Sequence, residues 1–200
     1  MEILHTDKDL VVCVKPVGLD SESGVPQALK EQLGGEIFPL HRLDQNVGGV
    51  MVYARTKAAA AALSKTIQTG QMVKEYIAKV HGTPEDAGVW TDLLFKDSRK
   101  NKVFVVKKAR SGVKEAKLQY RHLGDGLVHV KLFTGRSHQI RVQFSSRGFP
   151  LVGDHKYGSR AKETAPMLFS CRISFPYKGQ QYGFRALPQW AENAVLEEWT

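Results

Sequence analysis

The sequence predicts an α+β fold built around a largely antiparallel central sheet with flanking helices. Segments with strand character outnumber helical ones, and several neighbouring strands are joined by hairpin turns rather than by the crossovers that parallel sheets need. The clearest hairpin signal is Gly124-Asp125-Gly126, which separates the strand candidates 117–121 and 127–132. No internal repeat, low-complexity tract or linker interrupts the 200 residues, so we interpret 1–200 as a single domain.

Turn and capping residues place the elements of the N-terminal half. Thr56 is a suitable N-cap for a helix with an Ala-rich body, and Gly70 is its C-terminal signal. The expected elements are strand 9–14, turn 15–18, helix 26–33, a buried strand after Gly48-Gly49, helix 57–68 and strand 72–80.

The C-terminal half is predicted to be richer in strands. Pro176-Tyr177-Lys178-Gly179 has the composition of a second hairpin turn, and Gly148 and Pro150 end a helix that begins after Gly135. The expected elements are strand 103–106, the hairpin 117–121 and 127–132, helix 137–147, and strands 167–175 and 181–186.

The charge of the chain is strongly positive and unevenly placed. Apolar residues make up 42% and charged residues 24%, which is ordinary for a globular protein, but the net charge is +9 and the pI about 9.6. Residues 96–121 carry a net +8 and residues 130–160 a net +5, which leaves −4 for the rest. Such a surface favours a polyanion, and Lys107 and Lys108 are candidates for phosphate contacts. A solvated basic loop that serves solubility is the alternative.

Cysteine usage indicates neither a disulfide framework nor a metal site. Cys13 and Cys171 each lie in an apolar strand-like run, and no CxxC spacing or Cys/His cluster suggests zinc. We expect buried free thiols and no metal. Because the chain opens with no signal peptide and no apolar run approaches the roughly 20 residues of a membrane span, we expect a cytoplasmic protein.

The segment His41-Arg42-Leu43-Asp44 is the leading candidate for catalysis. Its carboxylate stands just ahead of Gly48-Gly49, where glycine lets the chain turn or lets another backbone approach closely. A loop on a rigid scaffold is a common place for functional groups. The alternative is that Asp44 only caps the turn or pairs with Arg42.

A second candidate segment runs from Thr134 to Gln143. A helix that begins near Ser137, with Arg136 beside its first turn, would offer a phosphate site. His138 and Arg141 are three residues apart and would share one helix face. The alternative is an amphipathic helix whose polar face is merely solvated.

Together these segments resemble the RluA-type pseudouridine synthases. His41-Arg42-Leu43-Asp44 is similar to the HRLD motif of that family, and Lys74-Glu75-Tyr76 to its K-x-Y strand. Residues 135–141 are similar to its GRxHQ[IL]R motif and residues 150–158 to its PxxGDxxYG motif, while 9–18 fit the entry strand and KPxG turn. The motifs occur in the family order across nearly the whole chain.

The resemblance implies a sheet with a catalytic cleft between two halves, and the isomerisation of uridine in structured RNA without metal or organic cofactor. The expected partner is ribosomal or transfer RNA. We expect the protein to act as a monomer and to have no membrane partner. Carried over position by position, Asp44 is the catalytic aspartate, Arg141 its basic partner and Tyr76 the residue that stacks on the target base. The RNA-binding candidates are His41, Arg42, Arg136, His138, Lys107 and Lys108.

The chain also departs from the family pattern. The family continues after HRLD with a basic residue and Thr-Ser-Gly, whereas this chain has Gln45, Asn46, Val47 and Gly48-Gly49. We expect that the loss of the Thr and Ser hydroxyls weakens the support of the loop or reflects a different RNA substrate. Because the entry strand begins almost at Met1, we also expect no small N-terminal RNA-binding domain of the kind common in the family, and we expect recognition to rest on the catalytic domain.

Two rival functions stay open at this point. The first is a non-catalytic RNA-binding protein of the same fold, which would bind RNA without isomerising it. The second is a carboxylate-pair glycosidase or nucleosidase, with Asp154 as the second acid, although the basic composition argues against a small neutral substrate.

Overall fold

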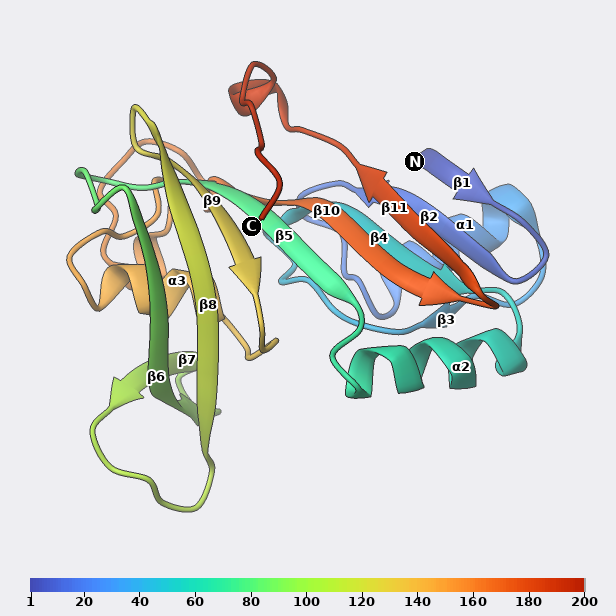
Figure 1. The fold of residues 1–200 in the computed structure, drawn as a ribbon, viewed down its shortest axis with the longest axis horizontal. Helices are drawn as coiled ribbons and strands as arrows, with labels where there is room; N and C mark the ends of the chain where they lie inside the picture. The colour runs from blue at the N-terminus through green and yellow to red at the C-terminus, as the bar shows by residue number, and fades with distance from the viewer. Residues whose placement is uncertain (200) are drawn as a thin grey trace. The chain divides into compact units, whose positions relative to one another are not determined.

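The computed structural model describes residues 1–199, which divide into two compact units. Unit 1 consists of Met1–Glu75 and Phe169–Pro188, and unit 2 of Tyr76–Leu168 and the residues from Gln189 on. The strands are mostly antiparallel and are accompanied, in the described part, by three α-helices (Figure 1). These elements confirm the α+β class. The interpretation of 1–200 as one catalytic domain stays a prediction.

Unit 1 has a small sheet in the strand order β1-β2-β4-β10, with β3 paired to β4 and β11 to β10. Its pairs are antiparallel except β4 with β10, which is parallel. The elements are β1 (Glu2–Thr6), β2 (Leu10–Lys15), α1 (Gly24–Leu33), β3 (Phe38–Pro39), β4 (Gly48–Ala54), α2 (Lys57–Gln68), the start of β5 (Val73–Lys79), most of β10 (Leu168–Tyr177), and β11 (Gln180–Arg185).

The core of unit 1 lies between its sheet and α2, which Figure 1 shows alongside the strands. Ala59 and Leu63 of α2 pack against β2 and β4, whose residues are almost all buried. The Ala59 N–H donates to the Thr56 hydroxyl at 3.1 Å, as the capping signal predicts. Both cysteines are buried and free, and burial raises the pKa of Cys13 to about 12.

Gly49 allows β4 to approach β10 closely. Gly49 pairs with Ser170, and its φ is +129°. A Cβ at this position would clash with the backbone N and O of Ser170. The expectation that a glycine here lets another backbone come close is therefore confirmed.

Unit 2 has the strand order β5-β9-β8-β6-β7. The β6–β7, β6–β8 and β8–β9 pairs are antiparallel. The elements are the remainder of β5, β6 (Ala87–Asp97), β7 (Lys102–Val106), β8 (Val113–Gly124), β9 (Leu127–Leu132), α3 (Gln139–Ser145), and the 3₁₀ turns His155–Tyr157 and Gln189–Ala191.

Both predicted hairpins are confirmed, and their turns have the expected chemistry. Gly124 pairs with Leu127 across Asp125-Gly126, and both turn residues have positive φ, +49° and +72°. Two such residues form a type I′ turn, which matches the twist of the flanking strands. Lys178-Gly179 forms the other turn, so β10 continues to Tyr177 rather than ending at 175.

One face of the unit 2 sheet is covered by α3. Trp90, Tyr120 and Phe144 form an aromatic cluster there, with ring centroids 4.4–5.4 Å apart. A second hydrophobic cluster contains Val142 of α3 together with Leu94, Val103, Ala116 and Tyr157. Because alternate strand residues point to opposite faces, the even-numbered residues of β6 and β8 face α3.

Two sequence expectations for unit 2 need correction. The helix predicted over 137–147 is shorter, Gln139–Ser145, because His138 has a left-handed backbone (φ +51°) and lies outside it. Residues 87–97, for which no element is predicted from the sequence, form the long strand β6. No helix within residues 1–199 is long and apolar enough to cross a membrane.

Candidate active site

The loop that carries Asp44 lies in unit 1 between β3 and β4. Asp44 itself is half-buried, and the Val47 N–H donates to its carbonyl oxygen at 2.9 Å, which closes a tight turn. The preceding residue, Leu43, is only 7% exposed and anchors the loop in the core. The carboxylate is therefore displayed on a turn whose neighbours are fixed on both sides.

Ser21 holds the Leu43 backbone from the other side. Its hydroxyl donates to the Leu43 carbonyl at 2.9 Å and accepts from the Leu43 N–H at 3.2 Å. Tyr53 of β4 in turn donates from its hydroxyl to the Ser21 carbonyl at 2.9 Å. Both polar groups of Leu43 are thus satisfied, and the residue before Asp44 is tied to the sheet.

Lys15 fastens the loop to the turn that follows β2. Its ammonium donates to three carbonyl oxygens, those of Pro16 (3.0 Å), Leu19 (2.7 Å) and Gln45 (3.0 Å). The side chain is fully buried, and burial lowers the pKa of Lys15 to about 8, although the negative charges of Asp20 and Asp44 partly oppose this shift. Lys15 thus places a positive charge within the electrostatic reach of Asp44.

Gln45 explains one departure from the family pattern. Its side-chain amide donates to the Gly18 carbonyl at 2.9 Å, and its own carbonyl accepts the Gly18 N–H at 2.9 Å. The residue that stands in place of the family's basic side chain therefore closes the turn after Lys15. This loop has support of its own, even without the Thr-Ser hydroxyls.

His41 has a structural contact in unit 1. Its Nε2 accepts the Val52 N–H at 3.3 Å, just beyond the point where β3 stops pairing with β4. Burial, and to a smaller extent the positive charge of Lys74, hold the pKa of His41 well below its usual value. The ring is therefore neutral near pH 7 and extends the β3–β4 pairing through its side chain. Its predicted RNA contact stays a prediction.

Arg42 is well placed for an external partner. Its guanidinium lies 3.6 Å from the Glu22 carboxylate, and both side chains are 58% exposed. An ion pair between such exposed groups contributes at most about 1 kcal/mol. A phosphate or a base can replace Glu22 at little cost.

The second group of predicted residues lies in unit 2, around Arg141. Its guanidinium forms a bidentate pair with Asp154, from Nε to Oδ2 at 2.7 Å and from Nη2 to Oδ1 at 2.9 Å. Arg141 is 7% and Asp154 1% exposed. Asp154 thus fixes Arg141, and its occupied carboxylate is poorly suited to act as the second acid of a glycosidase. The predicted pairing of Arg141 with Asp44 stays a prediction.

Tyr157 joins Arg141 to His138, which the sequence analysis expected to meet through helical spacing. The Arg141 guanidinium lies 5.1 Å from the centre of the Tyr157 ring. The Tyr157 hydroxyl is 2.8 Å from His138 Nδ1 and also accepts the Val103 N–H at 2.8 Å. His138 therefore contacts Tyr157 from a position just before α3, where its own backbone is left-handed.

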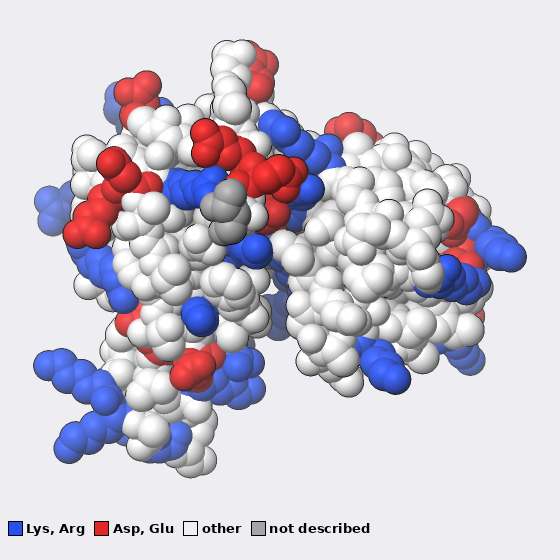
Figure 2. All heavy atoms as spheres, in the orientation of Figure 1, with Lys and Arg blue, Asp and Glu red and all other residues white. Residues whose placement is uncertain are grey.

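The remaining predicted residues are dispersed within unit 2. Tyr76 is on β5 and only 6% exposed, whereas Lys107 and Lys108 are exposed in the loop between β7 and β8. Arg136 is exposed, and its Nε donates to the Glu115 carbonyl at 2.8 Å. Figure 2 shows Lys and Arg side chains gathered at the lower left, where Figure 1 places this loop.

Sequence patterns predict no role in these sites for Lys15, Ser21 or Tyr157. Lys15 belongs to the KPxG turn and Tyr157 to the PxxGDxxYG motif, but no local signal reveals their contacts or those of Ser21, because the partners are distant in the chain. Within residues 1–199 no three His, Cys, Asp or Glu side chains gather as a metal ion requires. The absence of a metal from the reaction stays a prediction.

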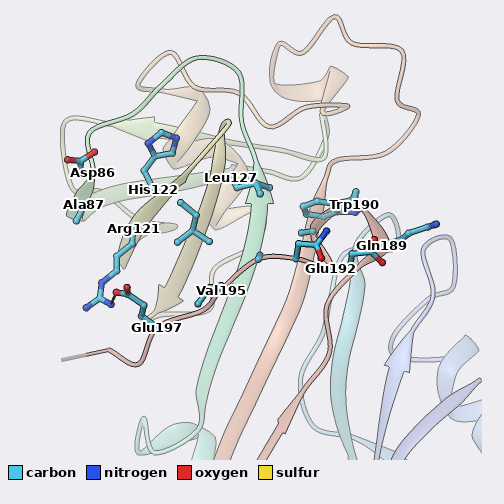
Figure 3. Close-up of a pocket in the computed structure, with 14 residues that line it drawn as sticks. Asp86, Ala87, Arg121, His122, Leu127, Gln189, Trp190, Glu192, Val195 and Glu197 are labelled. Atoms are coloured by element: carbon cyan, nitrogen blue, oxygen red, sulfur yellow. Dashed lines mark hydrogen bonds and ion pairs between the residues drawn. The ribbon is translucent and has the colours of Figure 1, made fainter.

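A cavity of about 650 Å³ lies in another part of unit 2 (Figure 3). The end of the β8–β9 hairpin forms one side and the C-terminal segment 189–197 the other. Arg121 spans it toward Glu197, with 3.3 Å between Nη1 and Oε2. None of the predicted site residues lines it, and its charges are mixed, so it is not the candidate site.

Comparisons with known proteins show the family to which the chain is similar. Residues 9–146 match the family described as RNA pseudouridylate synthase. The dual-specificity RNA pseudouridine synthase RluA of Escherichia coli strain K12 is 32% identical over 200 residues, which cover 92% of this chain and 91% of that protein. The ribosomal large subunit pseudouridine synthase C of Buchnera aphidicola is 30% identical over 168 residues, 78% of this chain and 53% of that protein.

Two solved structures are similar to the whole fold. Human RNA pseudouridylate synthase domain containing 4 has a TM-score of 0.78 at 28% identity and covers 94% of this chain and 89% of that one. Human RNA pseudouridylate synthase domain containing 1 has a TM-score of 0.83 at 21% identity, over 98% and 90% of the two chains, and shows the shared fold.

Proposed function

Because this chain belongs to the RNA pseudouridylate synthase family, we propose that it isomerises particular uridines of structured ribosomal or transfer RNA, with Asp44 as the catalytic carboxylate. The family gives the reaction class, an RNA pseudouridine synthase. The choice of RNA and the roles of individual residues are the proposal.

The observation that carries the proposal is the way the loop presents Asp44. Ser21 fixes Leu43 on one side, and Lys15 fixes Gln45 on the other. A carboxylate held between two anchored neighbours loses little freedom when it meets substrate, which is what preorganised catalysis requires. The negative charge of Asp44 in turn partly opposes the lowering of the Lys15 pKa, so the two side chains interact electrostatically.

The reaction exchanges one bond to the ribose for another. The bond from N1 of uracil to C1′ breaks, the base turns, and C5 bonds to C1′; N1 gains a proton and C5 loses one. Atoms and electrons balance within the nucleoside, so the step needs no oxidant or reductant. Asp44 can act by attacking the nucleoside or as base and charge stabiliser.

The target uridine has to leave its stack before Asp44 can reach it. Flipping a base out costs a few kcal/mol and leaves a gap in the RNA. Arg42, whose ion pair with Glu22 is exposed and weak, is available to fill that gap. We assign Tyr76 to stacking on the flipped base and Arg141, fixed by Asp154, to pairing with the catalytic carboxylate.

The names of the relatives and the positive charge support the proposed substrate class. One relative is named a dual-specificity RNA enzyme and another a ribosomal large subunit enzyme. The net charge of +9 favours a large polyanion over a free nucleoside. Ribosomal or transfer RNA is the class that fits both.

The test compares two Asp→Asn variants of the same unit. Release of tritium from C5 of uridine-labelled ribosomal and transfer RNA measures turnover, and a filter-binding assay measures RNA affinity. Asp44→Asn keeps the side-chain volume but loses the charge, so we expect no detectable turnover, a loss of several powers of ten, with RNA affinity within about a fewfold.

Asp20→Asn is the matched control. Asp20 also lies near Lys15, but it is exposed and its Oδ1 accepts the Ser23 N–H, a bond that asparagine can keep. We expect nearly normal turnover. A substantially active Asp44→Asn would overturn the assignment of Asp44, and wild-type protein that binds both RNAs without releasing tritium would favour the non-catalytic reading.

A further inference from the structure

A small basic hollow in unit 2 is not used by the reaction described above. It has a volume of about 180 Å³, and its polar lining includes Lys96, Lys114, Arg136 and Ser137 over an apolar floor of Leu94 and Val103. We call it the basic hollow. Ligand pockets for whole small molecules are usually about 300–1,000 Å³, so this one suits a single compact group.

The strand register explains why two lysines converge there. Lys114 of β8 lies directly opposite Leu94 of β6, and Lys96 of β6 lies opposite Val103 of β7. Residues paired in this way point to the same face of a sheet. Leu94 and Val103 pack against Val142 of α3, so both ammonium groups lie on the face that carries α3 and Arg141.

Arg136 reaches the same hollow from the loop before α3. Its Nε donates to the Glu115 carbonyl at 2.8 Å, which orients the guanidinium and leaves its two Nη groups for another acceptor. The neighbouring residue Gly135 leaves the approach open, because a Cβ there would meet nothing within 4 Å. The third cation is thus positioned by backbone rather than by an acid.

No carboxylate neutralises these three cations within residues 1–199. The residues that line the hollow include no acid, and no ion pair of the described chain involves Lys96, Lys114 or Arg136. Asp97 and Glu115, the acids adjacent in sequence, alternate to the other face of the sheet. Three like charges around one hollow that has no acid in its lining favour the binding of an anion there.

We propose that the basic hollow binds one phosphate of the RNA backbone, a contact that rests on the proposed function. A tetrahedral phosphate fits three convergent cations and a hydroxyl, and it needs no base or sugar inside the hollow. Lys107 and Lys108 are also exposed, in the loop between β7 and β8. Several exposed cations in unit 2 fit a chain of phosphates better than a single free anion.

The first experiment measures the salt dependence of RNA binding. We compare wild type with the triple variant Lys96→Ala, Lys114→Ala, Arg136→Ala, and with a control triple of exposed helix lysines, Lys30→Ala, Lys57→Ala, Lys65→Ala. Each triple removes the same charge. Loss of one phosphate contact should lower affinity about tenfold and reduce the slope of log K against log salt by about 0.7–0.9. The control should stay within about twofold of wild type.

The second experiment replaces single phosphates of the RNA by neutral methylphosphonates. A methylphosphonate at one particular linkage should lower the RNA affinity of wild type by the same factor of about ten. The same replacement should not lower the RNA affinity of the hollow triple any further. If the triple variant folds poorly, the comparison of RNA affinities is repeated with the single variant Lys96→Gln and its control Lys30→Gln, each of which removes one exposed charge. No such linkage, or equal losses in hollow and control variants, would overturn the proposal.

A free phosphate is the competing source of the same chemistry. Titration with inorganic phosphate, followed by amide NMR shifts at Gly112 and Ser137, separates the two. Shifts that the triple abolishes while its RNA affinity is unchanged would assign the hollow to a free anion and overturn the RNA contact. If wild type converts uridine and the hollow triple and the control triple bind RNA with equal affinity, only the proposed phosphate contact in the basic hollow is refuted. If wild type binds no RNA, the proposed function is refuted as well.

Discussion

Lys15 should make the folded state more stable as the pH rises from about 8 to about 10.5. Burial lowers the pKa of Lys15 from its ordinary 10.5 to about 8. Between those values the unfolded chain binds a proton that the folded chain has released. Raising the pH therefore favours the folded state in this window, and below pH 8 both states are protonated and the gain is absent.

The expected size follows from the two pKa values. They differ by about 2.5, and each pH unit of that window contributes about 1.4 kcal/mol, so the total is about 3–3.5 kcal/mol. That is a large share of the roughly 5–15 kcal/mol that stabilises a typical domain.

The measurement is urea unfolding of wild type and Lys15→Met at pH 7, 8, 9 and 10.5. Methionine has a similar length and does not titrate, while every other group, including Lys74 with its pKa also lowered to about 8, is present in both proteins. The difference in unfolding free energy, wild type minus variant, should rise by about 3–3.5 kcal/mol across the window. A difference that is flat, or that falls with pH, would refute this account of Lys15.

Two further substitutions test contacts that position the sites. Gly49→Ala should destabilise the fold by at least about 3 kcal/mol, because the new methyl meets the Ser170 backbone and φ is +129°, whereas Gly183→Ala, with open space around it, should change the urea midpoint little. Asp154→Asn should cost about 3–5 kcal/mol in urea unfolding, because it removes the negative charge from the buried bidentate pair with Arg141; a loss below about 1 kcal/mol would mean that Asp154 does not hold Arg141.

Local signals were sufficient where the structure depends on neighbouring residues. Thr56 caps α2, and Asp125-Gly126 and Lys178-Gly179 close their hairpins, because caps and tight turns are decided by a few adjacent residues. Strand β6 was not predicted because it carries Asp92 in its middle. Tertiary partners there, chiefly the bidentate pair with Arg147 at 2.9 and 3.1 Å, satisfy a charge that lowers strand preference.

The candidate sites were predictable as motifs but not as contacts. The loop of Asp44 was recognised, whereas the three carbonyl bonds of Lys15 were not, because they join residues up to 30 positions apart. The start of α3 was placed too early because a left-handed His138 follows no propensity rule; its bond to Tyr157, 19 residues later, accompanies that conformation. Spacing along a helix could not reveal that Tyr157 connects His138 and Arg141.

The pairing of Gly49 with Ser170 also has a consequence for synthesis on the ribosome. The Ser170 hydroxyl donates to the Val50 carbonyl across 120 residues of chain, so the edge of β4 next to the Asp44 loop waits for β10 to emerge. At about 5–20 residues per second, that delay is about 6–24 s. Throughout it, a nascent chain exposes an apolar strand edge of the kind that aggregates or recruits chaperones. The close approach that glycine permits is thus among the last contacts of unit 1 to form.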